Sequence, residues 1–262
     1  MRFKSAFLQV TLALLVANSA EAADAQVRFG KLAEAQPGEF RVFVMAAIKG
    51  PLETVLTNVQ QKIGKPIVVE YGGSRGSLHD AIVAGQAFEV AILLPDVNEE
   101  ILKKGMVAPG TYPIAMVPIA LGIRGEAPAG LDVASEAGLK KAMLGAKSVK
   151  YAPTGAAITT VKTIFSKLDI GDKVKDTSAQ SGTVALGPGE YEMNIFPFSE
   201  IEANKALRNL GNVIAPLQVS AGIEATIGAH ANDLKAALTF VKFLQGPEID
   251  AGLKANMMVK AK

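Results

Sequence analysis

The sequence predicts an α/β protein of two lobes, with the second lobe inserted in the first. Two strand–loop–helix units follow one another near the N-terminus, with strands at residues 40–44 and 67–69. A third unit of the same kind occupies residues 148–168. Because successive units of this type favour parallel sheets whose loops gather at the carboxyl edge, the pattern predicts a ligand cleft between two facing lobes. Two crossing hinge segments are expected near Leu121 and Val219.

The N-terminal segment has the features of a secretory signal peptide. Arg2 and Lys4 precede an apolar run over residues 6–17, and small residues, Ala20 and Ala22, occupy the two positions that a signal peptidase reads. These features predict cleavage after about Ala22 and a periplasmic location. A single-pass membrane anchor is the alternative, but the run is shorter than the ~20 residues that span a bilayer.

Composition excludes several classes of protein. The chain has 262 residues, 49% of them hydrophobic, which is enough for well-packed cores and not typical of a disordered chain. The net charge of +2 gives no general attraction to nucleic acid or to a membrane surface. The absence of cysteine excludes thiol catalysis and disulfides. With only two histidines, His79 and His230, a histidine-rich metal site or a Ser-His-Asp hydrolase is disfavoured, and we expect no metal and no cofactor.

Lobe 1 is expected to comprise residues 40–121 and 220–262, after a mobile lead-in over residues 23–39. Its strands are alternating or β-branched runs, and its helices carry apolar residues on one face. The strands are expected at residues 40–44, 67–69, 88–94 and 117–123, and the helices at about 51–59, 78–83, 97–105 and 234–244. Pro118 indicates an edge or crossing position in the fourth strand.

Lobe 2 is expected to comprise residues 122–219, after a linker rich in Pro, Gly and Ala. Its helices are expected at residues 139–144 and 159–168, its strands at 148–151 and 193–198, and an extended return segment at 212–219. Thr183 is expected to open a further helix-like segment, which makes it a candidate ligand contact.

A glycine-rich loop over residues 70–78 is the strongest candidate for a binding site. It connects a predicted buried strand to a predicted helix and contains Ser74, Arg75 and Ser77 between glycines. Glycines let a ligand approach the backbone, Ser74 or Ser77 can cap the helix, and Arg75 supplies a fixed positive fork. Together with the unpaired amides of a helix start, these groups predict an anion site. The alternative is an ordinary strand-to-helix turn with a surface arginine.

The second half contains a matching loop. Thr154, Gly155 and Ala156 follow a predicted strand and precede a predicted helix, so their hydroxyl and amides are expected to clamp the ligand from the opposing lobe. Lys49, at the start of the first helix, either pairs with a ligand carboxylate or is simply solvated. Tyr71 either reaches the cleft or packs beneath the glycine-rich loop.

Four segments together carry a resemblance to a known family. They read Val-Phe-Val-Met-Ala-Ala-Ile-Lys at residues 42–49, Tyr-Gly-Gly-Ser-Arg-Gly-Ser-Leu at 71–78, Phe-Ser-Glu-Ile at 198–201 and Phe-Leu-Gln-Gly-Pro-Glu at 243–248. In this order they resemble the molybdate-binding-protein-like branch of periplasmic type II solute-binding proteins. The resemblance extends from about Arg41 to about Met258. It implies a periplasmic-binding-protein type II fold, whose lobes close about a hinge on a small anion held by amides and hydroxyls.

The chain departs from that family's pattern at two positions. Molybdate binders have a serine where Ala47 stands, and a tyrosine that falls near Pro197 or Phe198, which makes Phe198 a candidate contact without the hydroxyl. Ser74 matches the family's second-loop serine, while Arg75 adds a fork-shaped donor. The resemblance therefore implies a larger organic anion, such as a tricarboxylate, more than molybdate itself.

Two functions follow from the resemblance. The same branch includes a periplasmic aconitate isomerase, to which the chain is similar in overall length, signal peptide and lack of cysteine. This implies interconversion of trans-aconitate and cis-aconitate by an allylic proton shift, with Glu200 as the base and Arg75 as the catalytic carboxylate clamp. The other reading of Glu200 is a helix N-terminal acid. The alternative function is the solute-binding component of an ABC importer for a small oxyanion or organic acid, with a permease as partner.

Overall fold

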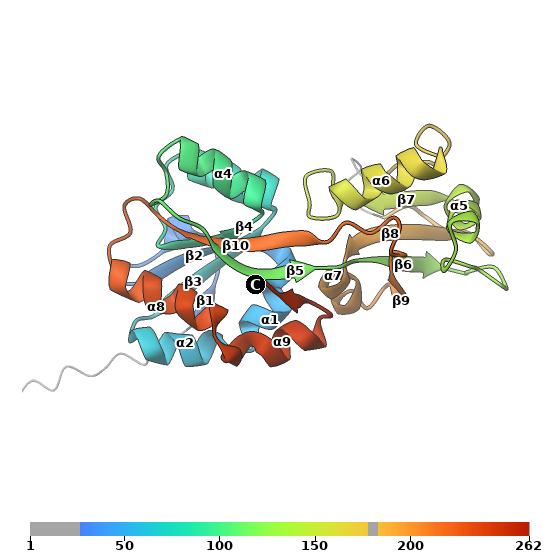
Figure 1. The fold of residues 1–262 in the computed structure, drawn as a ribbon. Coiled ribbons are helices and arrows are strands. Elements are labelled where there is room, and N and C mark those ends of the chain that lie inside the picture. The colour runs from blue at the N-terminus through green and yellow to red at the C-terminus, as the bar shows by residue number, and fades with distance from the viewer. Residues whose placement is uncertain (1–26, 178–182, 262) are drawn as a thin grey trace, which may run out of the picture.

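The protein has two lobes, each built around its own sheet (Figure 1). The computed structural model describes residues 27–177 and 183–261. The predicted signal peptide and its cleavage site lie outside the described residues. Each lobe has a separate hydrophobic core, one around Phe40, Phe43 and Phe240 and the other around Leu121 and Ile195.

The sheet of lobe 1 has the strand order β1-β3-β2-β4-β10-β5-β11. The first four pair in parallel, and β10, β5 and β11 add antiparallel strands. Buried Val, Ile and Leu runs account for the central strands, because a parallel strand is covered on both faces. The strands are β1 (Val27–Phe29), β2 (Phe40–Met45), β3 (Ile67–Gly72), β4 (Val90–Leu93), β5 (Tyr112–Val117), β10 (Ala221–Ile227) and β11 (Val259–Lys260).

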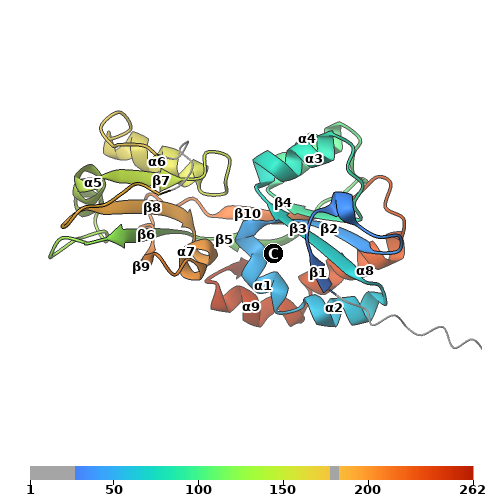
Figure 2. The ribbon, with the colours of Figure 1, turned by 180° about the vertical axis from the view of Figure 1, so that it is seen from behind.

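Helices cover both faces of this sheet. Figures 1 and 2 show α2, α8 and α9 on one face and α3 and α4 on the other. The α-helices are α1 (Lys49–Glu53), α2 (Leu56–Ile63), α3 (His79–Val83), α4 (Pro95–Lys103), α8 (Leu234–Gln245) and α9 (Asp250–Ala255). Shorter helical turns are η1 (Leu32–Glu34), η2 (Ala46–Ile48), η3 (Ser74–Leu78) and η4 (Pro247–Ile249).

The sheet of lobe 2 has the strand order β7-β8-β6-β9, with β7 and β8 parallel and the other pairs antiparallel. Its strands are β6 (Ile119–Gly125), β7 (Ser148–Tyr151), β8 (Tyr191–Pro197) and β9 (Arg208–Asn212). Its helices are α5 (Glu136–Gly145), α6 (Ile158–Leu168) and α7 (Phe198–Ala203). Figure 2 shows α7 at the end of lobe 2 that faces lobe 1.

Two segments connect the lobes. The chain leaves the first sheet at the end of β5 and enters the second at the start of β6, with only Pro118 between them. It returns through residues 213–220 into β10, which pairs with β5 (Figure 1). Thr160 of α6 anchors the returning segment, since its Oγ1 donates to the Val219 carbonyl at 2.9 Å and accepts from the Val219 amide at 3.1 Å.

Several predicted elements differ from those observed. The expected strand at residues 117–123 is two strands in different sheets, because proline at 118 has no N–H to continue either ladder. The expected lead-in contains β1, which pairs with β3, so a wholly mobile lead-in is wrong. The first helix is divided between α1 and α2, and the extended segment at 212–219 contains a turn after β9. Strand β10 was not predicted.

Among the described residues, no helix combines the length and the apolar character needed to cross a membrane.

Candidate anion site between the lobes

Loops from both sheets meet where the two lobes face each other. In lobe 1, η2 and η3 follow β2 and β3, and in lobe 2 the 152–157 loop and α7 follow β7 and β8. All four therefore lie at carboxyl ends of parallel strands, where α/β sheets place ligands. Among the described residues, two hydrogen bonds cross the interface: Arg75 Nη1 donates to the Gly155 carbonyl at 3.1 Å, and Ser199 Oγ donates to the Ala47 carbonyl at 2.6 Å.

The glycine-rich loop and the 152–157 loop are in close contact. A Cβ atom placed on Gly76 would lie 3.6 Å from Thr154 Oγ1. Ala156, although it belongs to lobe 2, is buried in the hydrophobic core of lobe 1. The structure therefore brings together Ser74, Arg75, Thr154, Gly155 and Ala156, as the sequence predicts for the two facing loops.

Arg75 is held in place by Asp96, which lies in the first turn of α4. The guanidinium donates from Nε to one Asp96 oxygen at 2.6 Å and from Nη2 to the other at 3.0 Å. With the bond to Gly155, three of its five N–H groups have protein acceptors. The remaining two have no acceptor in the described part of the chain and are available to a ligand, and the paired geometry fixes the plane of the guanidinium.

A cavity of about 330 Å³ lies beside this arginine. Both lobes and the returning crossing segment contribute to its lining, which includes Arg75, Asp96, Ala156, Thr159 and Ser220. It has a guanidinium on one side and small or hydroxyl residues on the other. This combination suits a small anion better than an apolar ligand.

The N-terminus of α6 opens on the same side of the interface and has no side-chain cap. Its N-cap residue is Ala157, and its first turn contains no acidic residue. Within the described chain, the amides of Ala156, Ala157, Thr159 and Thr160 have no protein acceptor. An eleven-residue helix with bare N-terminal amides favours a negative charge at that end. The cavity therefore has anion-binding groups from both lobes.

Ser74 has a structural contact that the sequence did not indicate. Its side chain is buried, and its Oγ accepts a hydrogen bond from the Leu94 amide at 2.9 Å. The hydroxyl proton has no acceptor among the described residues, but Ser74 does not line the cavity beside Arg75.

We expect Ser74→Ala to lower the free energy of unfolding by about 1–3 kcal/mol, because the buried Leu94 amide would lose its acceptor. Chemical denaturation of the variant and of the parent protein measures this difference. Ser77→Ala is the matched control, since Ser77 is exposed and makes no such contact. Equal stability of the Ser74 and Ser77 variants would show that the buried hydrogen bond contributes nothing.

The other candidates in lobe 1 lie outside this cavity. The Lys49 ammonium lies 3.9 Å from the Glu53 carboxylate and 5.3 Å from the centre of the Tyr71 ring. Tyr71 also stacks on Phe29, and its buried hydroxyl makes no hydrogen bond to any described residue. Burial, with a smaller contribution from Glu53, raises the pKa of Tyr71 above its usual value. These contacts favour a packing role for Tyr71.

Ser77 and Phe198 are also separated from the arginine cavity. The Ser77 hydroxyl lies against Gly72, where a Cβ would collide with it. The Phe198 amide donates to the Pro118 carbonyl at 3.0 Å, which ties the start of α7 to the first crossing segment. Neither residue lines the cavity that contains Arg75.

Glu200 and Thr183 line a different cavity, of about 190 Å³, within lobe 2. This cavity shares no lining residue with the cavity beside Arg75. Thr183 begins no helix, because residues 183–187 have no regular secondary structure. The structure therefore places Glu200 and Arg75, predicted to act as base and clamp in one site, on the linings of two different cavities.

Burial raises the pKa of Glu200 to about 7. Because the unfolded carboxyl ionises at lower pH than the folded one, this group lowers the free energy of unfolding as the pH rises from about 4.5 to about 7. We expect Glu200→Gln to remove this part of the pH dependence, a difference of up to about 3 kcal/mol. Denaturation at several pH values measures it. Parallel pH profiles for the two proteins would contradict the expectation.

Sequence reasoning missed Asp96, Thr159, Ser199 and Ser220. Asp96 directly follows a strand and begins a helix, so its position at the carboxyl edge was predictable from the order of elements. Thr159 and Ser220 lie at the cavity only because the returning segment passes α6. The Ser199 contact with Ala47 depends on how the lobes meet.

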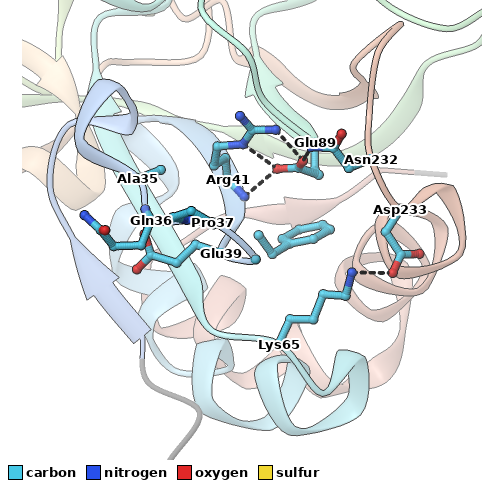
Figure 3. Close-up of a pocket in the computed structure, with 11 residues that line it drawn as sticks. Ala35, Gln36, Pro37, Glu39, Arg41, Lys65, Glu89, Asn232 and Asp233 are labelled. Atoms are coloured by element: carbon cyan, nitrogen blue, oxygen red, sulfur yellow. Dashed lines mark hydrogen bonds and ion pairs between the residues drawn. The ribbon is translucent and has the colours of Figure 1, made fainter. Parts of the chain in front are cut away.

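A further cavity, of about 330 Å³, lies at the amino ends of the lobe 1 strands (Figure 3). Its charged groups are paired with one another: Glu89 accepts from Arg41 and Asn232, and Lys65 contacts Asp233 at 2.6 Å. Glu39 is likewise paired with Arg28. This cavity therefore has no unsatisfied charge to offer a ligand.

The fold and the position of the site define a class of protein. Two α/β lobes with mixed sheets, joined by two crossing segments, form the periplasmic-binding-protein type II fold, which confirms the predicted fold class. A family model described as "Bacterial extracellular solute-binding protein" matches residues 40–256. The chain therefore belongs to this family of extracellular solute-binding proteins.

Solved structures with the same fold agree with this assignment. The periplasmic molybdate-binding protein of Azotobacter vinelandii is 20% identical, with 85% of this chain and 100% of that chain covered and a TM-score of 0.62. The sulfate-binding protein SubI of Mycobacterium tuberculosis is 12% identical, with 86% and 87% covered and a TM-score of 0.65. A putative phosphate ABC transporter substrate-binding protein of Clostridium perfringens, solved with bound phosphate, is 13% identical, with 86% and 100% covered and a TM-score of 0.58. No curated protein sequence matched the chain.

Proposed function

We propose that this protein is the solute-binding component of an ABC importer and that it holds a small anion between its lobes. The observation that carries the proposal is the convergence of the Arg75 guanidinium and the uncapped N-terminus of α6 on one inter-lobe cavity. Membership of the solute-binding family supports the role in transport. The three structures reported above are named for molybdate, sulfate and phosphate, which are all oxyanions.

The ligand contacts that we propose are the two N–H groups of Arg75 that have no acceptor among the described residues, and the bare amides of α6. The hydroxyl of Thr159 completes the set from lobe 2, whereas Ser74 and Thr154 belong to the two facing loops and do not line this cavity. These donors are neutral apart from one guanidinium, and Asp96 already balances its charge. The site therefore resembles one that binds by directed hydrogen bonds more than by net charge. A tetrahedral oxyanion or a small carboxylic acid fits the cavity.

We also propose that the mature chain begins after about Ala22 and works in the periplasm, as its N-terminal sequence predicts.

Interconversion of trans-aconitate and cis-aconitate is the other function predicted from the sequence. None of the three structures reported above is named an isomerase, and the proposed base, Glu200, lines a cavity separate from Arg75. Both observations favour a protein that binds its ligand and releases it unchanged over an isomerase.

One experiment tests both functions. The mature protein is titrated calorimetrically with molybdate, sulfate, phosphate, citrate and trans-aconitate, and proton NMR then follows the trans-aconitate sample. We expect saturable binding of at least one anion with a stoichiometry of one, and an unchanged trans-aconitate spectrum. Appearance of cis-aconitate would establish the isomerase instead. Failure of every anion to bind would overturn the proposed site.

A further inference from the structure

The lobe 2 cavity that contains Glu200 lies on one face of the lobe 2 sheet. Along β8 the side chains alternate: Met193 and Ile195 belong to the hydrophobic core, whereas Glu192, Asn194 and Phe196 line the cavity. Helix α7 and the segment after it cover this face. A Cβ on Gly122 would lie 2.8 Å from Ile201 and 3.2 Å from Leu207, so glycine allows this close cover. The cavity is thus enclosed between the lobe 2 sheet and the helix and segment that cover it.

The base of the cavity contains an ion pair, Glu192 with Arg124, whose two charges cancel. Glu192 is buried and accepts from Ser148 Oγ at 2.7 Å and from Arg124 Nε at 3.3 Å. Arg124 also donates from Nη2 to the Val184 carbonyl. Two of its five N–H groups therefore have acceptors among the described residues, and the others remain for an acceptor in the cavity.

Glu200, unlike Glu192, has no partner of opposite charge among the described residues. Its carboxyl makes no hydrogen bond or ion pair with any residue in the described ranges, and burial raises its pKa to about 7. The charged or titratable groups that share its cavity are Arg124 on β6, Lys150 on β7 and Glu192 on β8. Arg124 is committed to Glu192, and Lys150 has an interaction of its own. A carboxyl in this situation is stabilised as an anion by a cation that enters the cavity.

Beyond the charged groups, the lining of this cavity of about 190 Å³ is mixed. Phe196, Ile201, Ala206 and Leu207 form its apolar part, and Thr183, Asn194 and Asn204 add uncharged polar side chains. A ligand that places its polar groups in this space has room for only a few further heavy atoms. The cavity therefore combines an unpaired carboxyl, free guanidinium donors and a small apolar wall.

We propose that this cavity is a second binding site, which takes a small α-amino acid with a short apolar side chain. The ammonium group pairs with Glu200, the carboxylate accepts from the free N–H groups of Arg124, and the side chain contacts Phe196 and Leu207. Opposite charges at the two ends of the ligand match the two kinds of charge in the cavity. This site is independent of the anion site between the lobes, because the two cavities share no residue.

The test uses the purified mature protein and three probes: L-alanine, propionate, which lacks the ammonium, and ethylamine, which lacks the carboxylate. Chemical-shift titration of the labelled protein measures saturable binding. We expect L-alanine to bind and the two single-charge probes to bind at least about tenfold more weakly. We also expect tighter binding at about pH 8 than at about pH 6, because the ligand selects the ionised form of Glu200.

Two variants test whether the Glu200 carboxylate itself holds the ammonium group. Glu200→Gln keeps the size of the side chain and is expected to weaken L-alanine binding at least about tenfold at about pH 8. Glu202→Gln, on the exposed side of the same helix, is the matched control and is expected to leave binding unchanged. A third variant, Arg75→Gln, is likewise expected to leave L-alanine binding unchanged. Circular dichroism establishes that each variant is folded.

Three results would overturn the proposal: no saturable binding of L-alanine, equal binding of propionate, or loss of L-alanine binding in the Arg75 variant. Loss of binding in the Arg75 variant would place L-alanine in the anion site between the lobes. None of these results bears on the anion titrations, so the two proposed sites fail or stand separately.

Discussion

Arg75→Gln is expected to weaken anion binding between the lobes by about ten- to a hundredfold. The substitution removes the charged fork and its two free N–H groups, while glutamine keeps only a neutral amide of shorter reach. It also removes the hydrogen bond to the Gly155 carbonyl, which joins the lobes at this interface. Calorimetric titration with the anion that binds the parent protein measures the loss.

The controls for this prediction separate charge from geometry. Arg208→Gln removes an exposed arginine of β9 and is expected to leave affinity unchanged. Arg75→Lys keeps the charge but replaces the fork by a single ammonium, so it is expected to recover only part of the affinity. If Arg75→Gln bound the anion as tightly as the Arg208 variant, Arg75 would not be a ligand contact.

Glu89→Gln is expected to lower the free energy of unfolding by about 3 kcal/mol. Glu89 is 2% exposed and accepts from the amide, Nε and Nη2 of Arg41 and from Asn232 (Figure 3). A neutral side chain would leave the Arg41 guanidinium partly buried without its counter-charge. Guanidinium chloride denaturation measures the change.

A matched substitution tests whether burial is the cause. Glu99→Gln breaks a pair with Lys103 on an exposed helix face and is expected to cost no more than about 0.5 kcal/mol. Anion binding is expected to be unchanged in both variants, because Glu89 lies at the opposite edge of the sheet from Arg75. A similar small loss in both would show that the Arg41–Glu89 pair is worth no more than a surface pair.

Local sequence patterns predicted those strands that are continuous apolar or β-branched runs. The runs at residues 40–44, 67–69 and 148–151 are strands, since buried parallel strands read as continuous apolar or β-branched segments. Strand β10 was missed because Ala221–Ile227 is not a continuous apolar run: its apolar residues, Ile223, Ala225 and Ile227, alternate with Gly222, Glu224 and Thr226. Its place between β4 and β5 depends on pairing with residues more than 100 positions earlier in the sequence.

The candidate site was predicted in part for the same reason. Ser74, Arg75 and Thr154 stand out because glycine or small residues surround them at strand ends, and the strand ends of parallel units meet. Glu200 stands out equally well, but it lines a cavity that shares no lining residue with the cavity beside Arg75. That difference depends on how α7 packs against the lobe 2 sheet, which a sequence motif does not reveal.

The sequence by itself determined that the chain forms two α/β lobes and that glycine-rich and small-residue loops end their strands, because these properties follow from local periodicity and backbone chemistry. Only the tertiary structure decided which loops meet. The contact of Arg75 with Asp96 and Gly155, and the assignment of Glu200 to a separate cavity, arise from packing between segments far apart in the chain. Such contacts depend on the shape of both lobes at once, which no single stretch of sequence specifies.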